Sequence, residues 1–254
     1  MNKISVIILT KNSAATIERA IMSVRQISND ILVIDSGSED DTLTIASKLN
    51  ARIFHITWQG YGAARNIGAK EALFDYIFCL DSDEEISQEL AQSINNLNLV
   101  PHAVYGCKRI NFLGRKKILY GEWGNDYVFR LYNRNSTSWN LNLVHETLDA
   151  NHLKKIKLQG VMLHYTTPDI ETFSKKLEQY ANLNARHYFD QKKKVGFIKR
   201  HLSPAFNFFN NFIIKLGFLD GKEGWQIAKA NYHYTREKYL QLKRLQDKSA
   251  TTKK

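Results

Sequence analysis

Cysteines and long apolar runs are both scarce in this chain of 254 residues, and each scarcity excludes a class of protein. The two cysteines, Cys79 and Cys107, are too few for a disulfide framework and lack the spacing of a metal site. The apolar run near the start is only about six residues long before Lys11, which is too short for a signal peptide or a membrane span. We therefore expect a cytosolic protein.

Glycine-rich phosphate loops are also missing. No G-x-G-x-x-G follows the first apolar run and there is no P-loop, which disfavours a dinucleotide-binding Rossmann site. Instead, short apolar runs at 4–9, 31–34, 51–56 and 76–80 alternate with stretches of helical spacing. This βαβαβαβ order with short connections predicts an α/β fold, a mostly parallel sheet with helices on both faces.

Polar residues end three of these runs, namely Thr10, Asp35 and Asp81. The carboxyl ends of parallel strands share one edge of a sheet, where open α/β sheets bind their ligands. A nucleotide-sized site is therefore expected at this edge. Asp81 and Asp83 can share a divalent cation that also binds substrate phosphates. The alternative interpretation is an acidic helix start with Ser82 as its N-cap.

Acidic residues are scarce in the last two-fifths of the chain. Residues 1–150 carry 15 Lys and Arg against 17 Asp and Glu, whereas residues 151–254 carry 21 against 8. The excess of positive charge favours an anionic partner, which can be nucleic acid, anionic lipid or a phosphorylated glycan.

The stretch 204–219 is strongly aromatic. Its 16 residues are interrupted by three asparagines and a lysine, so it is too short and too polar to cross a bilayer. A buried core helix and an interfacial helix at a membrane surface both remain open. We expect an α/β domain at 1–166, with two parts at 1–99 and 100–166. A helical, basic extension should follow at 167–254.

Four short motifs occur in a fixed order over the first ninety residues. They are ISVIILTKN at 4–12, DSGS at 35–38, GAARN at 62–66 and DSD at 81–83. Together they resemble the family 2 glycosyltransferases, which have a GT-A fold.

A second set of motifs extends the resemblance over most of the chain. It consists of WQGYG at 58–62, RLYNR at 130–134, VHE at 144–146 and LDGKEGW at 219–225. These motifs are similar to those of the bacterial lipopolysaccharide-core branch, the β-1,4-glucosyltransferases that act on inner-core heptose.

The resemblance implies an inverting transfer of a hexose, with glucose the first choice, from a UDP-sugar to an acceptor hydroxyl. The domain at 1–166 would then be the catalytic domain, with a nucleotide-sugar half at 1–99 and an acceptor half at 100–166. Thr10 and Asp35 would hold the uridine base, and Arg65 would lie beside the nucleotide. The implied nucleotide-sugar contacts are Thr10, Asp35, Ser36, Gly62, Arg65, Asp81 and Ser82.

The resemblance also implies a divalent cation, Mg²⁺ or Mn²⁺, that bridges the diphosphate and stabilises the leaving nucleotide. Asp83 would bind this ion, Asp81 would contact it or the ribose, and His164 fits the role of a histidine ligand from a late strand. The alternative for His164 is an imidazole at a strand end with no ligand role.

Inversion needs a general base that takes the proton of the acceptor hydroxyl. Glu146 is the first candidate and His145 the second, and a salt bridge within a loop is the alternative for both. Arg130 and Arg134 are candidate contacts of the diphosphate or of an acceptor phosphate, since arginine matches phosphate oxygens. Both can equally be surface charges.

An anionic glycolipid acceptor at the inner leaflet would explain the basic extension, which would hold the enzyme peripherally at the cytoplasmic membrane. One alternative is a polyprenyl-phosphate glycosyltransferase. Another is a nucleic-acid-binding protein, although no nucleic-acid-binding signature is present and no such partner is expected. A third is a relative that binds nucleotide without catalysis.

Overall fold

The computed structural model describes residues 2–142 and 146–251, and the chain forms two compact units. The first unit contains the residues up to Arg109 together with Tyr127–His164. The second contains Ile110–Asp126 together with the residues from Tyr165 onward. The chain passes between the units three times, and the last passage, after His164, lies close to the expected boundary after residue 166. Residues 110–126, in contrast, were expected in the acceptor half and belong to the second unit.

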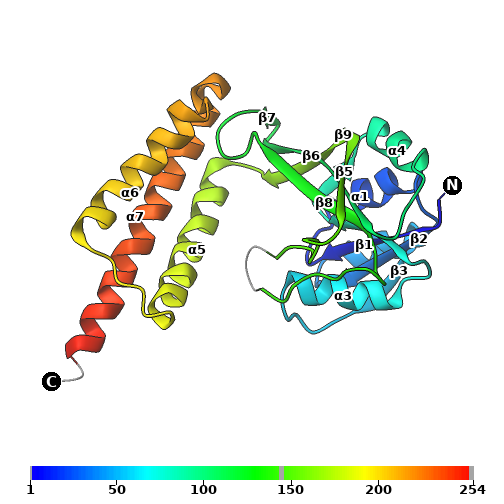
Figure 1. Cartoon of the computed structure of the whole chain (residues 1–254), viewed down its shortest axis with the longest axis horizontal. Helices are drawn as coiled ribbons and strands as arrows, with labels where there is room; N and C mark the ends of the chain where they lie inside the picture. The colour runs from blue at the N-terminus through cyan, green and yellow to red at the C-terminus, as the bar shows by residue number, and fades with distance from the viewer. Residues whose placement is uncertain (1, 143–145, 252–254) are drawn as a thin grey trace. The chain divides into compact units, whose positions relative to one another are not determined.

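The first unit is built on a mixed sheet with the strand order β3-β2-β1-β4-β8-β6-β9-β5 (Figure 1). The strands are β1 (Ile4–Thr10), β2 (Asp30–Asp35), β3 (Arg52–His55), β4 (Tyr76–Asp81), β5 (Glu84–Ile86), β6 (Ala103–Leu113), β8 (Asp126–Asn133) and β9 (Lys154–Thr167). Strands β3, β2, β1 and β4 are parallel, whereas β8 runs antiparallel to β4 and β5 runs antiparallel to β9.

Both faces of the parallel strands are covered. The helices of this unit are α1 (Ile17–Val24), α2 (Thr42–Lys48), α3 (Tyr61–Glu71) and α4 (Gln88–Asn95). Val6 and Ile8 of β1 belong to an apolar cluster with α1, α2 and α4, while Ile7 and Leu9 belong to a second cluster with α3. Because alternate side chains enter two cores, the strand is a continuous apolar run in the sequence.

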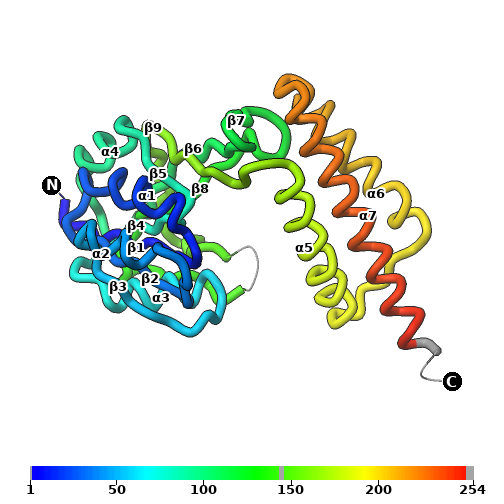
Figure 2. The backbone as a smooth tube through the Cα atoms, turned by 180° about the vertical axis from the view of Figure 1, so that it is seen from behind, coloured from blue at the N-terminus to red at the C-terminus, as the bar shows by residue number. Residues whose placement is uncertain are grey.

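The second unit is helical. It contains β7 (Lys116–Ile118), α5 (Ile170–Asp190), α6 (Phe197–Phe209), a π-helical turn η1 (Asn210–Ile214), a 3₁₀ turn η2 (Gly217–Asp220) and α7 (Lys222–Thr251). Helix α7 lies between α5 and α6 and packs against both (Figure 2). No helix among the described residues is long and apolar enough to cross a membrane.

The apolar cluster of the second unit explains why residues 110–126 belong to it. Leu113 and Ile118, on the hairpin formed by the end of β6 and by β7, are buried against Phe173 of α5 and Ile227 of α7. This contact joins residues more than fifty positions apart, so local sequence patterns do not reveal it.

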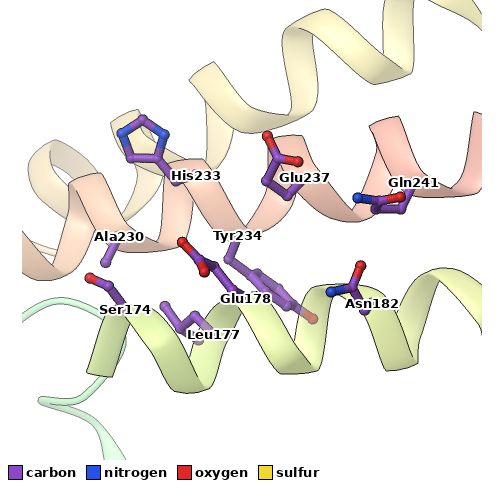
Figure 3. A pocket seen from close by; sticks show the side chains of 9 residues that line it. All are labelled: Ser174, Leu177, Glu178, Asn182, Ala230, His233, Tyr234, Glu237 and Gln241. Atoms are coloured by element: carbon purple, nitrogen blue, oxygen red, sulfur yellow. The ribbon is translucent and has the colours of Figure 1, made fainter. Parts of the chain in front are cut away.

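An open cavity of about 370 Å³ lies between α5 and α7 (Figure 3). Its lining combines polar and apolar surface and includes Glu178, His233 and Glu237. The two carboxylates give this side of the helical unit acidic character, although the unit as a whole is basic.

Candidate active site

Three parallel strands end at one edge of the sheet and bring the predicted polar residues together. Thr10 lies opposite Asp35 in the register of β1 and β2, and Leu9 lies opposite Asp81 in the register of β1 and β4. The backbone turns over the same edge after β4, where the Ser82 amide donates to the Leu9 carbonyl at 3.1 Å.

Asp35 is held by its own loop. Its carboxylate accepts hydrogen bonds from the Gly37 amide at 3.0 Å and from the Ser38 amide and hydroxyl at 3.1 and 2.5 Å. Burial acts to raise the pKa of Asp35, but the hydrogen bonds from Ser38 and Gly37 outweigh burial and lower it. Asp35 therefore stays a carboxylate, a form that can only accept hydrogen bonds.

His55 is a site residue that the sequence analysis missed. It ends β3 opposite Asp35, and its Nδ1 lies 3.3 Å from the Asp35 carboxylate. The His55 side chain is 69% exposed, so it stands at the open side of the edge. No motif marks this histidine, and only the pairing of β3 with β2 places it there.

Thr10 presents a polar atom without a partner. Its Oγ1 is buried and makes no hydrogen bond with any described residue. A buried hydroxyl without a partner costs free energy, so Thr10 is suited to bind an incoming ligand. The two predicted serines are engaged nearby: the Ser36 hydroxyl donates to the Thr10 carbonyl at 3.3 Å, and the Ser82 and Ser13 hydroxyls are 2.7 Å apart.

Asp81 lies between two buried arginines. Its Oδ1 accepts from Arg65 Nη2 at 2.8 Å, and its Oδ2 accepts from Arg130 Nη2 at 3.0 Å. Burial acts to raise the pKa of Asp81, but the charges of Arg65 and Arg130 outweigh it and hold the pKa well below its usual range. Both oxygens of Asp81 are thus engaged by arginine.

Glu84, which was not predicted as a site residue, holds both Asp81 and Arg130 in position. It is buried, and it accepts hydrogen bonds from the Asp81 amide at 2.9 Å, from Arg109 at 2.8 Å and from Arg130 at 3.2 Å. Arg130 is therefore not a surface charge, because its guanidinium is buried between two carboxylates. Both contacts use Nη2, and the buried Nε of Arg130 makes no hydrogen bond with any described residue.

Glu146 reaches the same cluster from a distant part of the chain. Its carboxylate accepts from Arg65 Nη1 at 2.6 Å and is 18% exposed. The Arg65 guanidinium lies 4.4 Å from the centre of the Trp139 ring, which covers it. Arg65 therefore joins Asp81 to Glu146, and the salt bridge that the sequence analysis left open for Glu146 is present.

Gly62 and Asn66 of the GAARN motif position the segment that carries Trp139. A Cβ atom on Gly62 would lie 1.9 Å from the Asn140 carbonyl oxygen, so only glycine allows the segment to come this close to α3. The Asn66 amide group bonds the Trp139 backbone twice, at 2.8 and 3.0 Å. Gly62 is thus a position where close packing requires glycine.

Arg65→Met should destabilise the fold by about 3–5 kcal/mol, because it leaves a buried ion-pair cluster without one of its cations. Urea unfolding measures this loss. The control is Lys175→Met, which breaks an exposed pair with Glu171 and should cost only about 0.5 kcal/mol. A loss for Arg65→Met no larger than that of the control would show that the cluster does not stabilise the fold.

Asp83 and His164 lie at the side of the cluster, with His164 Nε2 3.4 Å from Asp83 Oδ2. His164 pairs with Glu84 in the register of β9 and β5, which brings this late histidine to the carboxylate segment. Among the described residues, no three His, Cys, Asp or Glu side chains are close enough to hold a metal ion by themselves. One carboxylate and one imidazole nevertheless fit a Mg²⁺ or Mn²⁺ ion that takes its remaining ligands from water and substrate phosphates.

A family model described as glycosyl transferase family 2 matches residues 5–148, which is more than half of the chain. The chain belongs to this family. A glycosyltransferase of Rickettsia prowazekii, itself uncharacterised, is 30% identical over 263 residues, covering 98% of this chain and 88% of the relative. A similar protein of Rickettsia typhi is 31% identical over 239 residues, covering 89% and 81%.

The fold of this glycosyltransferase is the GT-A fold. The structure of a mannosyltransferase from Pyrobaculum calidifontis, solved with GDP-Man and Mn²⁺, matches it with a TM-score of 0.57 and 11% identity. The match covers 94% of this chain and 86% of that chain. At this identity the likeness concerns the fold alone.

One predicted residue, Arg134, does not lie at the edge of the sheet that carries Asp81. Arg134 lies beside the amino end of β4, opposite to the edge that carries Asp81, because β8 runs antiparallel to β4. There it pairs with Asp75 at 2.9 Å and donates to the carbonyls of Ala69 and Ala72 at the end of α3. His145, the second candidate base, lies outside the described residues.

Proposed function

We propose that this glycosyltransferase moves a hexose, with glucose the first choice, from a UDP-sugar to a lipid-linked, anionic glycan with inversion at the anomeric carbon. The acceptor class that the sequence favours is the lipopolysaccharide core. The observation that carries the proposal is the gathering of Thr10, Asp35, Asp81 and Asp83 with Glu146 around one edge of a GT-A sheet.

In the donor part of the site, Thr10 and Asp35 bind the nucleobase. Support comes from the unpaired Thr10 hydroxyl and from the ionised, pre-oriented Asp35 carboxylate, which together offer a hydroxyl and an acceptor to a base edge. The mannosyltransferase with the same fold was solved with a nucleotide sugar. Asp81 contributes by holding Arg65 and Arg130 in place beside the nucleotide.

Asp83 and His164 would hold the divalent cation, either Mg²⁺ or Mn²⁺. The exposed carboxylate of Asp83 and its 3.4 Å separation from His164 support this assignment, as does the Mn²⁺ in the mannosyltransferase structure. Asp81 is a weaker ligand candidate, since two arginines already engage its oxygens. When bound, the cation would stabilise the negative charge on the leaving diphosphate.

Glu146 is the general base of the proposed mechanism. It accepts the proton of the acceptor hydroxyl while the hydroxyl oxygen forms a bond to the anomeric carbon and the bond to the diphosphate breaks. Arg65 orients the Glu146 carboxylate at 2.6 Å and links it to the Asp81 side of the site. This linkage supports a base that acts close to the donor.

The test is a UDP-release assay with a panel of UDP-sugars, run with Mn²⁺, with Mg²⁺ and with EDTA. We expect metal-dependent release from one donor, which would identify the sugar. Addition of lipopolysaccharide-core and polyprenyl-phosphate acceptors should then increase release with the former only. No release with any UDP-sugar, together with no UDP binding in calorimetry, would overturn the proposal.

Thr10→Val should weaken UDP binding about fivefold, the equivalent of one hydrogen bond, without loss of stability. The isosteric change removes a buried hydroxyl that has no partner within the described protein, so unfolding should be unaffected or slightly more difficult. Calorimetry with UDP and urea unfolding measure the two effects. Unchanged UDP affinity would remove Thr10 from the base-binding set.

The membrane is part of the proposal, because a lipid-linked acceptor is reached at a membrane surface. We propose peripheral association with the inner face of the cytoplasmic membrane through the basic helical unit. The excess of positive charge in residues 151–254 supports this location.

A further inference from the structure

The helical unit exposes an unusual amount of apolar surface in one segment. Half of the large hydrophobic side chains that are exposed in the described residues lie between Phe197 and Trp225. They are Phe197, Ile198, Leu202, Phe206, Phe209, Ile213, Ile214, Leu216, Phe218, Leu219 and Trp225. A soluble surface rarely gathers so many apolar side chains unless it binds something.

Helix α6 has two apolar sides, and only one of them is packed. Phe208 and Phe212 face α7, where their rings lie 5.0 and 5.3 Å from the Trp225 ring. Ile198, Leu202, Phe206, Phe209 and Ile213 recur at intervals of four and three residues and thus form a second, continuous stripe. All five are exposed, with Leu202 at 62% and Phe206 at 64%. The stripe therefore has no partner within the described unit.

The stripe continues into the turns after α6. Leu216 has a left-handed backbone with φ of 59°, and it turns the chain between the π-helical and 3₁₀ segments. Ile214, Leu216, Phe218 and Leu219 are all exposed at this turn. Helix α6 thus ends in a hydrophobic tip. We call the α6 stripe and this tip together the apolar surface.

The charged residues next to the apolar surface indicate what kind of partner it binds. Residues 191–219 contain six lysines and arginines and no acidic residue. Lys192, Lys193, Lys194 and Lys199 precede or begin α6, and Lys215 lies at the tip, all with exposed side chains. The acidic residues Glu178 and Glu237 lie instead at the cavity between α5 and α7. An apolar surface whose own segment carries six cations and no acidic residue matches the interface of an anionic bilayer, where apolar side chains enter the acyl boundary and lysines reach the headgroups.

We infer that the apolar surface docks the helical unit onto an anionic lipid bilayer, with α6 lying in the plane of the interface and the tip at Leu216–Leu219 inserted. This inference identifies the surface that contacts the membrane, and it rests on the proposed function, in which the acceptor is lipid-linked. Vesicle binding needs no sugar nucleotide, however, so it can fail while metal-dependent UDP release is retained, and the reverse also holds.

The experiment is co-sedimentation of the full chain with vesicles of phosphatidylcholine alone or mixed with phosphatidylglycerol. We expect binding to the mixed vesicles only. Leu202→Glu with Phe206→Glu should weaken that binding at least tenfold, because two buried apolar contacts are replaced by charges that anionic lipid repels. The matched control is Leu183→Glu on α5, a side chain that is 58% exposed and should bind as wild type does.

A second pair of variants tests the charge component. Lys194→Gln with Lys215→Gln should weaken binding to the mixed vesicles about 25-fold, at about fivefold for each cation near the surface. Lys175→Gln on α5 is the control and should have no effect. Equal binding to both kinds of vesicle, or unchanged binding of the Leu202 and Phe206 double variant, would overturn the inference. Sedimentation velocity without lipid tests whether a second copy of the chain covers the apolar surface instead. A wild-type dimer that becomes a monomer in the Leu202 and Phe206 double variant would also overturn the inference.

Discussion

Asp83→Ala should reduce metal-dependent glycosyl transfer by on the order of 10³-fold. Loss of the exposed carboxylate would leave His164 alone to hold the cation, and cation stabilisation of a leaving group is worth several kcal/mol at about 1.4 kcal/mol for each tenfold in rate. Stability should not change, because the Asp83 side chain is 39% exposed and its 3.4 Å ion pair with His164 is partly open to solvent. UDP release at increasing Mn²⁺ concentrations measures the effect.

The control is Glu89→Ala, which removes an exposed carboxylate in the first turn of α4 and should leave the rate unchanged. His164→Ala should reduce the rate less than Asp83→Ala does. We expect it to raise the Mn²⁺ concentration that gives the half-maximal rate. A near-normal, EDTA-sensitive rate in Asp83→Ala would show that the metal is held elsewhere.

Glu146→Gln should lower the transfer rate by about 10²–10⁴-fold, the range that general base catalysis contributes. UDP binding should be unaffected, because the glutamine oxygen can still accept the hydrogen bond from Arg65 that the structure shows at 2.6 Å. The measurement pairs transfer to an acceptor with calorimetry of UDP binding. A fall in rate without a fall in UDP affinity separates a base from a structural ion pair.

The same assay tests the competing interpretation of Glu146. If the residue only stabilises the loop, Glu146→Gln should keep nearly the full rate and should lower the free energy of unfolding, because Arg65 loses one of its two carboxylate partners. That result would exclude Glu146 as the base and would direct the assay to His145→Ala. Glu171→Gln, in an exposed pair with Lys175, is the control for a charge change of the same size.

The parts of the site that follow strand ends were predictable. Thr10, Asp35 and Asp81 each follow a buried apolar run, and parallel strands bring their carboxyl ends to one edge. His164 was also predictable as a partner of Asp83, although only through the family resemblance.

The pairing of charges was not predictable. Glu84 and Glu85 are adjacent and identical in type, yet Glu84 is buried under Asp81 while its neighbour is partly exposed. Arg130 and Arg134 share one motif, but four positions along an antiparallel strand carry Arg134 to the other edge of the sheet. Strand direction and register decide such placements, and neither is encoded in the local pattern around these residues.

The sequence by itself determined the α/β class, the edge where the site lies and the basic, aromatic character of the last third of the chain. These properties follow from local composition, from periodicity and from the rule that parallel strands end together. Tertiary structure alone decided that Arg65 joins Asp81 to Glu146, that residues 110–126 pack with the helices, and which side of α6 is left uncovered. Each of these depends on contacts between segments far apart in the chain, whose geometry exists only once the sheet and the helices have packed.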